Sequence, residues 1–469
     1  MKQGLALGCA LLFLAGCSQS YQAERDYWKA EKMLSGVTKA MVQEQGPQVF
    51  DPAIAAFKKV YEQFPGTEKA ADSLFVISNL YLRQKKYDDA IRTLEKVIQN
   101  YSDKRERAPE ARYGIAGIYE ATGAWEKAEP LFWETAEYHS YHQKGLYAPV
   151  HVILHYKKVK DKDGMAAAYQ RALDFYNRML KQTGPIQAAS ALKNYLALAQ
   201  LANGSWREAR ATWDSLPKEF PDSSYAPLGL LASGELSWKK QELEAAAASY
   251  EDYLKSYPKH PLVTRTMVQL GMIYASQKNY GTAREWLEKA IQNEKKSETL
   301  ADVKLMIGKS YQDEGIWSEA EKVYQDIEAN HENTNAALQI PFLLASYHEE
   351  QGHADEAKKI LDEAITRYQS LVDGSDTRMA NVALRLQNAA YAEKGDWQNM
   401  LANFEQKIQE EKAPERRANW VFLKAVVTEK RLQDEAAART LYQQFLSQYP
   451  EHPLAALAKT RQEFLLKKA

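Results

Sequence analysis

The amino-acid sequence predicts an all-α solenoid of about eleven helical hairpins, closed at its C-terminus by a capping helix. Apolar and small residues recur at the three-, four- and seven-residue spacings of amphipathic helices. The pattern returns along nearly all of the 469 residues with an almost fixed period. Such a hairpin has apolar surface that it cannot bury alone, so it requires a copy of itself on either side. These three observations together indicate a solenoid.

The repeating unit is clearest in residues 265–291. Gly271 in the first predicted helix and Ala283 in the second lack bulk, so we expect the two backbones to approach closely where they cross. We expect residues 279–281, Asn-Tyr-Gly, to form the turn between the helices.

The small residue near the start of each second helix is here called the anchor residue. Successive anchors lie 37 or 38 residues apart, except for two intervals of 44 and 43 residues. The eleven anchor positions are Ala53, Ala90, Ala128, Met165, Ala209, Ala246, Ala283, Ala320, Ala357, Met400 and Ala438.

The unit resembles the tetratricopeptide repeat, which combines Leu-Gly-x-x-Tyr with a small residue one helix later, here Leu270-Gly271, Tyr274 and Ala283. The resemblance implies a superhelix whose first helices line a concave, peptide-binding face. Several second helices close on an aromatic residue and proline, as at Phe220-Pro221 and Tyr449-Pro450. This closure resembles the repeats of the assembly lipoprotein of the outer-membrane Bam machinery and of the periplasmic Tol-associated coordinator.

The first residues have the pattern of an export signal. A short apolar run ends in Leu14-Ala15-Gly16-Cys17, which resembles the lipobox of bacterial lipoproteins. The resemblance implies that residues 1–16 are a signal peptide, cleaved before Cys17, and that Cys17 carries lipid. Ser18, in place of aspartate, resembles an outer-membrane destination in a diderm source, with the protein facing the periplasm. Helical periodicity begins near Tyr21, so we expect the first repeat to lie close to the membrane.

The remaining elements follow in order. Asp51-Pro52 predicts an N-cap followed by a proline at the first helical position. The two long intervals contain the turn-rich stretches 182–185 and 373–376, which we interpret as seams. They divide the repeats into segments 17–182, 186–372 and 376–469. Pro341 falls inside a predicted first helix, where we expect a kink or a late start. Residues 454–467 predict a polar-faced helix that caps the solenoid.

Composition and motifs argue against several function classes. The 61 basic and 62 acidic residues leave a formal net charge of −1, whereas nucleic-acid binding usually requires a strongly basic face. The sequence contains no Walker loop, no Gly-x-Ser-x-Gly elbow, no dinucleotide-binding glycine motif and no His-Glu-x-x-His. We therefore predict a protein that is not an enzyme and uses neither cofactor nor metal.

Four histidines keep one enzymatic alternative open. His151 and His155 are four residues apart on a predicted helix and can share one face, whereas His139 and His142 fall in another segment. No carboxylate lies at an obvious ligand spacing, so we expect solvated or packed histidines. A metal-dependent hydrolase that uses these residues remains the less favoured alternative.

The favoured function is a lipid-anchored scaffold that holds envelope proteins or peptides in the groove formed by its first helices. A glycan-binding solenoid in polysaccharide export or wall maintenance is a further alternative, in which Trp238 or Trp420 would contact the glycan. The sequence leaves the partner, the process and the oligomeric state open. The predicted groove side chains are Phe75, Asn79, Tyr113, Asn194, Trp238, Met272, Phe342, Arg385 and Trp420.

Overall fold

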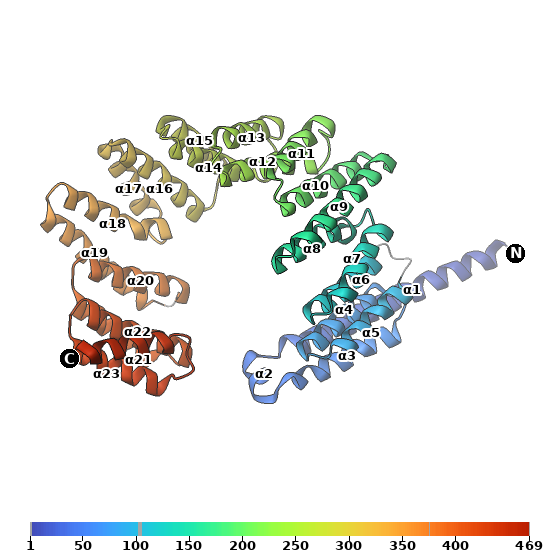
Figure 1. The fold of residues 1–469 in the computed structure, drawn as a ribbon, viewed down its shortest axis with the longest axis horizontal. Coiled ribbons are helices and arrows are strands. Elements are labelled where there is room, and N and C mark those ends of the chain that lie inside the picture. The colour runs from blue at the N-terminus through green and yellow to red at the C-terminus, as the bar shows by residue number, and fades with distance from the viewer. Residues whose placement is uncertain (1, 102–105, 375, 469) are drawn as a thin grey trace. The chain divides into compact units, whose positions relative to one another are not determined.

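The computed structural model describes residues 2–101, 106–374 and 376–468, and within them the side chains from Gln19 to Lys467. This part of the chain contains twenty-four α-helices, one short 3-10 helix and no strand (Figure 1). The elements are α1 (Lys2–Ser35), α2 (Lys39–Gln45), η1 (Pro47–Phe50), α3 (Asp51–Gln63), α4 (Glu68–Arg83), α5 (Tyr87–Asn100), α6 (Arg107–Ala121), α7 (Trp125–Tyr138), α8 (Gln143–Val159), α9 (Lys162–Gln182), α10 (Ile186–Asn203), α11 (Trp206–Glu219), α12 (Tyr225–Lys239), α13 (Leu243–Ser256), α14 (Val263–Ser276), α15 (Tyr280–Asn293), α16 (Ser297–Glu314), α17 (Trp317–Asn330), α18 (Asn335–Glu350), α19 (Ala354–Val372), α20 (Thr377–Glu393), α21 (Trp397–Glu410), α22 (Pro414–Lys430), α23 (Glu435–Gln448) and α24 (Ala455–Lys468).

Consecutive helices pack as hairpins. The even-numbered helices α4 to α22 are the first helices, and each packs against the second helix that follows it, α5 to α23. Helix α1 forms the opening hairpin with α3, and α2 and η1 lie between them in the chain. Helix α24 packs on α23. Within the described residues, the predicted eleven hairpins and C-terminal capping helix are therefore confirmed.

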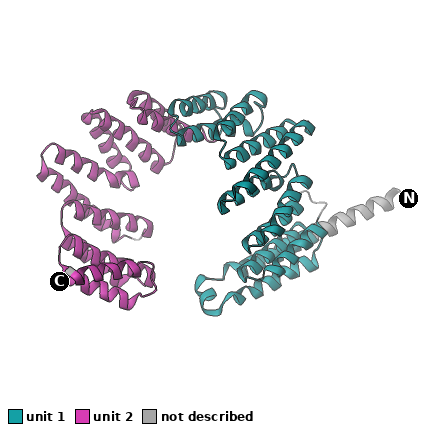
Figure 2. Cartoon of the chain, viewed as in Figure 1, with its two compact units in different colours: residues 1–260 teal, residues 261–469 magenta. Residues whose placement is uncertain are grey.

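The hairpins belong to two compact units, residues 1–260 and 261–469 (Figure 2). Each is considered by itself below. The division into three segments at the turn-rich stretches stays a prediction.

Small residues allow the helices of each hairpin to cross closely, as predicted. A Cβ atom added to Gly271 would lie 2.7 Å from Leu287 Cγ of the opposing helix, and one on Gly308 would overlap the Tyr324 ring. All nine alanine anchors are buried, with at most 2% of their surface exposed. Met165 and Met400, the two larger anchors, are half-buried.

The predicted turn at residues 279–281 is wrong by two residues. Tyr280 and Gly281 already belong to α15, which Asn279 caps by accepting a hydrogen bond from Thr282 N at 3.4 Å. The residue that reverses the chain is Lys278, with a φ of 60°. Gly281 therefore occupies the first turn of a helix, where no positive φ is required.

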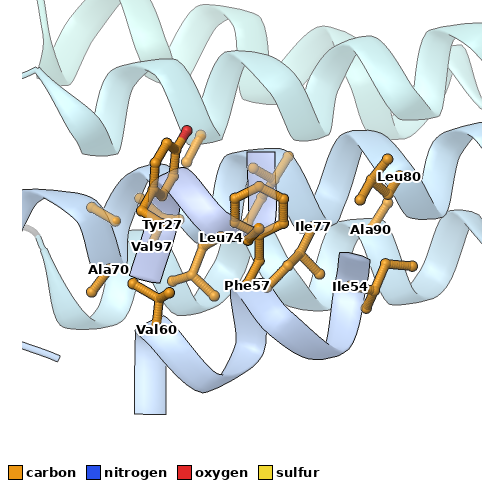
Figure 3. Packing of buried hydrophobic residues seen from close by; sticks show 14 of the residues in the cluster. Tyr27, Ile54, Phe57, Val60, Ala70, Leu74, Ile77, Leu80, Ala90 and Val97 are labelled. Atoms are coloured by element: carbon orange, nitrogen blue, oxygen red, sulfur yellow. The ribbon is translucent and has the colours of Figure 1, made fainter. Parts of the chain in front are cut away.

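The opening hairpin completes the first hydrophobic cluster of residues 1–260. Ala23, Tyr27 and Ala30 of α1 are buried, and Tyr27 packs edge-on against Phe57 of α3 with ring centroids 5.2 Å apart (Figure 3). Leu74 of α4 extends the same cluster. Helix α1 is thus part of the folded core from Ala23 onward.

The extra residues in the two long intervals lengthen helices. Helix α9 has 21 residues and α19 has 19, whereas most second helices have 14. Only residues 183–185 separate α9 from α10, so the first turn-rich stretch is a short connection.

Two local predictions require correction. Helix α18 begins at Asn335 and runs through Pro341, so it has no late start. A proline in a helix removes one backbone hydrogen bond, and the buried Leu338 and Ile340 beside it supply packing that maintains the helix. Asp51 is the first residue of α3 and not its N-cap; its carboxylate accepts a hydrogen bond from Gln84 Nε2 at 2.7 Å.

The capping helix is less polar than predicted. Ala458 and Leu465 of α24 are buried, but Leu457, Phe464 and Leu466 are about half exposed. The outer face of α24 therefore carries apolar side chains beside its basic ones.

Candidate functional site

Successive first helices contact one another within each unit. In residues 1–260, α6 packs on α8, α8 on α10 and α10 on α12; in residues 261–469, α14 packs on α16, α16 on α18 and α18 on α20. Four neighbouring first helices therefore form a layer in each unit, α6 to α12 in the first and α14 to α20 in the second.

One position of the repeat is exposed on this layer. The residue eleven positions before the anchor is exposed in six copies, whereas the residue immediately before it is buried in each of them. We call these six residues the exposed row: Asn79, Leu154 and Glu235 in the first unit, and Met272, Lys309 and Ser346 in the second. The structure places two predicted groove residues, Asn79 and Met272, in this row. Arg385 of α20 is also exposed.

Other predicted groove residues are half-buried and contact neighbouring helices. The Arg107 guanidinium carbon lies 5.9 Å from the centre of the Phe75 ring. Asn194 Oδ1 accepts a hydrogen bond from Trp213 Nε1 at 3.0 Å, which ties α10 to α11. These side chains hold helices together and offer only part of their surface to a ligand.

The remaining aromatic residues of the predicted groove are also partly covered. Phe342 stacks on Tyr368 with ring centroids 6.4 Å apart, and Trp420 lies 5.5 Å from Phe404. Trp238 is half-buried in the last turn of α12. Neither tryptophan proposed as a glycan contact forms an open aromatic platform.

Tyr113, the remaining predicted groove residue, belongs to a polar cluster between α6 and α8. Its hydroxyl lies 2.8 Å from His151 Nδ1. His151 Nε2 lies 2.7 Å from Glu120 Oε2, and His155 Nδ1 lies 2.6 Å from Glu120 Oε1. Both histidine rings are stacked, His151 on Phe132 and His155 on Trp125. The cluster thus joins two neighbouring first helices.

The hydrogen bonds are consistent with an ionised carboxylate at Glu120 that accepts from both histidines. Burial raises the pKa of Glu120, but the hydrogen bonds from His155 and His151 outweigh burial, so that the pKa lies below its usual value. An ionised carboxylate only accepts hydrogen bonds, so each histidine donates to it. His151 Nδ1 is then free to accept from the Tyr113 hydroxyl.

Sequence reasoning missed Glu120 as the partner of the two histidines. Glu120 precedes His151 by 31 residues and comes from another helix, so no local spacing shows the contact. His139 and His142 lie elsewhere, at the C-terminal end of α7 and the N-cap of α8. Among the described residues, no group of three or more histidine, cysteine, aspartate or glutamate residues has the arrangement of a metal site. The cluster therefore holds the neighbouring first helices α6 and α8 together. In the part of the chain that the structure describes, no arrangement of side chains favours the hydrolase alternative.

Aromatic side chains continue from this cluster across the layer. Tyr147 of α8 lies edge-on to His151 at 6.3 Å and to Tyr195 of α10 at 6.5 Å. Tyr113, His151, Tyr147 and Tyr195 therefore connect three successive first helices, and all but the buried Tyr195 keep part of their surface exposed.

Two open hollows lie beside second helices instead. One of ≈ 590 Å³ is lined by residues of α7 and α9, including Trp133 and Arg171. Another of ≈ 490 Å³ lies between α11 and α13, where Asp252 and Arg210 contribute charged walls. These hollows are an alternative contact surface that an experiment on the first helices must control for.

The predicted lipidation site, Cys17, lies outside the part of the chain whose side chains are described. A search of the described residues finds no helix that combines the length and apolar character required to cross a membrane.

Comparison with known protein families identifies tetratricopeptide repeats in this chain. A model described as a tetratricopeptide repeat-like domain matches residues 176–327. Two models described as tetratricopeptide repeats match residues 50–104 and 75–136 and residues 420–452. No curated protein sequence matches the chain.

Among solved structures, yeast Tom70 is 10% identical, with 97% of this chain and 96% of that chain covered and a TM-score of 0.36. BtubC (BKLC) from P. vanneervenii is 14% identical over 52% of this chain and 88% of its own, with a TM-score of 0.32. A tetratricopeptide repeat protein from Parabacteroides merdae ATCC 43184 is 16% identical over 60% of this chain and 99% of its own, with a TM-score of 0.29.

Proposed function

We propose that this chain is a non-enzymatic, lipid-anchored scaffold of the cell envelope that binds extended segments of other proteins on its first helices. The observation that carries the proposal is the exposed row, because it places an accessible side chain at the same repeat position of six first helices, five of which lie in the two layers of packed helices. The tetratricopeptide repeats support a protein-interaction role in general.

The exposed row suits a ligand held by many weak contacts. It contains an amide, two apolar side chains, an acid, a base and a hydroxyl, so no single chemistry dominates. Each member is fixed to a helix whose other face is buried, so little conformational entropy is lost when a ligand binds. An extended peptide that crosses α14, α16 and α18 would meet one such side chain on each of these successive first helices.

Membrane attachment is supported by the sequence at the N-terminus. Cys17 of the lipobox-like motif precedes Ala23, the first buried residue of the core, by only six positions. A lipid on Cys17 would therefore hold the opening hairpin close to the bilayer, with no long flexible arm between them. We propose an outer-membrane lipoprotein that faces the periplasm in a diderm source and serves the assembly of envelope complexes.

Site-specific photocrosslinking in the native envelope tests the binding surface. A photoreactive amino acid at Asn79 or Met272, in the exposed row, is expected to give crosslinks to one common set of partners. The matched controls are exposed residues of second helices: Asp252, which lines the hollow between α11 and α13, and Glu288 of α15, which lines another hollow of ≈ 300 Å³ together with residues of α16 and α17. We expect at least a tenfold lower yield at the controls. Equal yields at the four positions, or crosslinks at the controls alone, would refute a binding surface on the first helices.

A further inference from the structure

The outer face of α1 carries aromatic and basic side chains in one line. Tyr21, Arg25, Trp28 and Lys32 follow one another at spacings of four, three and four residues, which places them on one side of the helix. We call these four residues the α1 stripe. Tyr21 is 71% exposed and Trp28 is 58% exposed, among the most exposed large hydrophobic side chains described.

The α1 stripe lies opposite the face that α1 buries. Ala23, Tyr27 and Ala30 make contact with the core, and helical geometry places them on the other side of the helix from Tyr21 and Trp28. Packing within this chain therefore accounts for one face of α1 and leaves its aromatic face open.

Two exposed glutamates of α1 border the stripe, Glu24 beside Tyr21 and Trp28 and Glu31 beside Trp28. Glu24 pairs with Lys69 of α4, with Oε1 and Nζ 3.5 Å apart. Glu31 lies close enough to Tyr27, on the packed side, to help burial raise the pKa of that phenol to about 12. Asp26 contacts both Arg25 and Lys29, at 3.2 and 3.1 Å, so one carboxylate faces two cations. Lys32 Nζ lies 5.2 Å from the centre of the Trp28 ring and pairs with no carboxylate that we find among the described residues.

Tyrosine, tryptophan, arginine and lysine in one exposed line have the chemistry of the interface between lipid and water. Amphipathic aromatic rings concentrate at the level of the headgroups. Lysine and arginine side chains near an anionic surface are attracted to it. The stripe also begins four residues after Cys17, and Trp28 follows Cys17 by eleven residues, or about 16 Å along a helix.

We propose that the α1 stripe lies on the surface of an anionic lipid bilayer, with Tyr21 and Trp28 among the headgroups. The proposal extends the proposed function, since it supplies a second membrane contact beside the lipid on Cys17. One or two acyl chains hold a protein more firmly when a basic patch assists them. With both contacts made, α1 lies along the membrane and the opening hairpin has a defined orientation.

A second copy of this chain fits the stripe less well than a bilayer does. A twofold contact places the same surface on both partners. It would bring Arg25 and Lys32 against the cations of the copy, whereas anionic headgroups offer opposite charge. The stripe therefore favours lipid as its occupant.

Vesicle binding by an unacylated chain tests the proposal. The chain that begins at Ser18 lacks the leader and Cys17 but retains every residue whose side chain is described. We expect it to sediment with vesicles that contain phosphatidylglycerol and to bind phosphatidylcholine vesicles at least tenfold more weakly. The triple variant Arg25→Gln, Trp28→Ser, Lys32→Gln is expected to lose at least tenfold in affinity for the anionic vesicles. Because all three side chains are exposed, its circular dichroism spectrum should be unchanged.

A matched variant controls for nonspecific effects. Tyr141→Ser combined with Lys322→Gln and Lys359→Gln removes an aromatic ring of similar exposure and two exposed cations far from α1 in the sequence, and should bind as the unchanged chain does. Equal binding by the triple variant and the unchanged chain would overturn the proposal. So would failure of the unchanged chain to bind anionic vesicles, or a dimer in lipid-free solution that only the triple variant abolishes.

The anchor is tested separately. Mass spectrometry of the full chain isolated from its own envelope shows whether Cys17 is acylated. An unmodified Cys17 with intact vesicle binding would refute the lipid anchor and leave the α1 stripe standing. Acylated Cys17 without binding by the Ser18 chain would refute the α1 stripe and leave the anchor standing.

Discussion

Ten of the eleven hairpins have a residue with left-handed backbone conformation at the same position of the turn. Ten residues lie five positions before an anchor, and all ten have a φ between 58° and 97°. Five are glycines, such as Gly315, and five are lysine or glutamine, such as Lys278. A residue with a Cβ costs about 1 kcal/mol or more in this conformation, whereas glycine adopts it without that penalty. The geometry of the hairpin thus imposes the conformation even where the side chain disfavours it.

Substitution of a turn glycine should therefore destabilise the second unit. Gly315, with a φ of 85°, has no atom within 4 Å of an added Cβ, so Gly315→Ala tests the backbone alone. We expect a loss of about 1 kcal/mol in the free energy of unfolding, measured by urea denaturation. Lys278→Ala is the control, because its turn already carries a Cβ, and it should change stability by less than about 0.5 kcal/mol. Equal losses in the two variants would contradict this account.

The sequence predicts the anchor residues better than it predicts the turns or the polar cluster between α6 and α8. The anchors recur at a fixed spacing and face another helix, so burial constrains them to small side chains. The turn position has no such constraint, because solvent surrounds it and half of the copies contain lysine or glutamine there. For this reason the turn is predicted at Gly281, three positions after Lys278, the residue that reverses the chain. Glu120 is missed in the sequence for another reason, because its partners His151 and His155 lie one repeat away.

At the scale of elements, one buried carboxylate adds a polar contact to the apolar packing of the last helix. Glu429 of α22 has 4% of its side chain exposed. It accepts hydrogen bonds from the Tyr442 hydroxyl of α23 at 2.9 Å and from Arg461 Nε of α24 at 3.2 Å. Lys430 Nζ is 2.9 Å away. Three helices therefore meet at this group.

Removing the arginine should loosen the capping helix. Arg461→Met leaves the buried carboxylate without its main partner, and such losses cost about 3 kcal/mol. We expect a lower midpoint in urea and faster amide exchange in α24 than in the unchanged chain. The control is the double variant Glu429→Gln, Arg461→Met, in which no buried charge remains and stability should partly recover. A double variant less stable than Arg461→Met would contradict the role of the buried charge.

The Glu429 carboxylate also determines how the stability of the capping helix α24 depends on pH. Burial raises the pKa of Glu429, but the hydrogen bonds from Arg461, Lys430 and Tyr442 outweigh burial and lower it to about 2. The unfolded chain has a glutamate pKa of about 4.3. The stabilisation is therefore complete above about pH 4.3 and is lost as the pH falls toward 2. In Glu429→Gln, this part of the acid dependence should disappear.

Helix lengths mark a limit of prediction at the scale of elements. The intervals of 44 and 43 residues correctly indicate extra chain, but periodicity alone does not assign it to a turn or a helix. In α9 the additional turns bury Tyr176 and Met179, which stabilises the helix beyond the length of its neighbours. Burial of this kind depends on the packed neighbour, α10, and so appears only in the fold.

At the scale of the whole chain, stability is distributed along the repeats. Each hairpin of a solenoid contacts mainly its neighbours, so the total stability is approximately the sum of repeat and interface contributions. The two compact units, residues 1–260 and 261–469, each contain several packed hairpins. Only the second unit contains α24, whose buried Leu465 covers the end of its core.

The two units should therefore fold separately and differ in solubility. Residues 18–260 and 261–469, expressed as separate fragments, are each expected to show a helical circular dichroism spectrum and a cooperative urea transition. The first fragment ends on α13 without a capping helix, so it should associate at lower concentration in analytical ultracentrifugation. Fusing α24 after residue 260 would not restore the Glu429 contact and serves as the control for added length alone. If either fragment lacks helical structure at all concentrations, the units depend on each other, and nearest-neighbour contacts alone do not account for the stability of this chain.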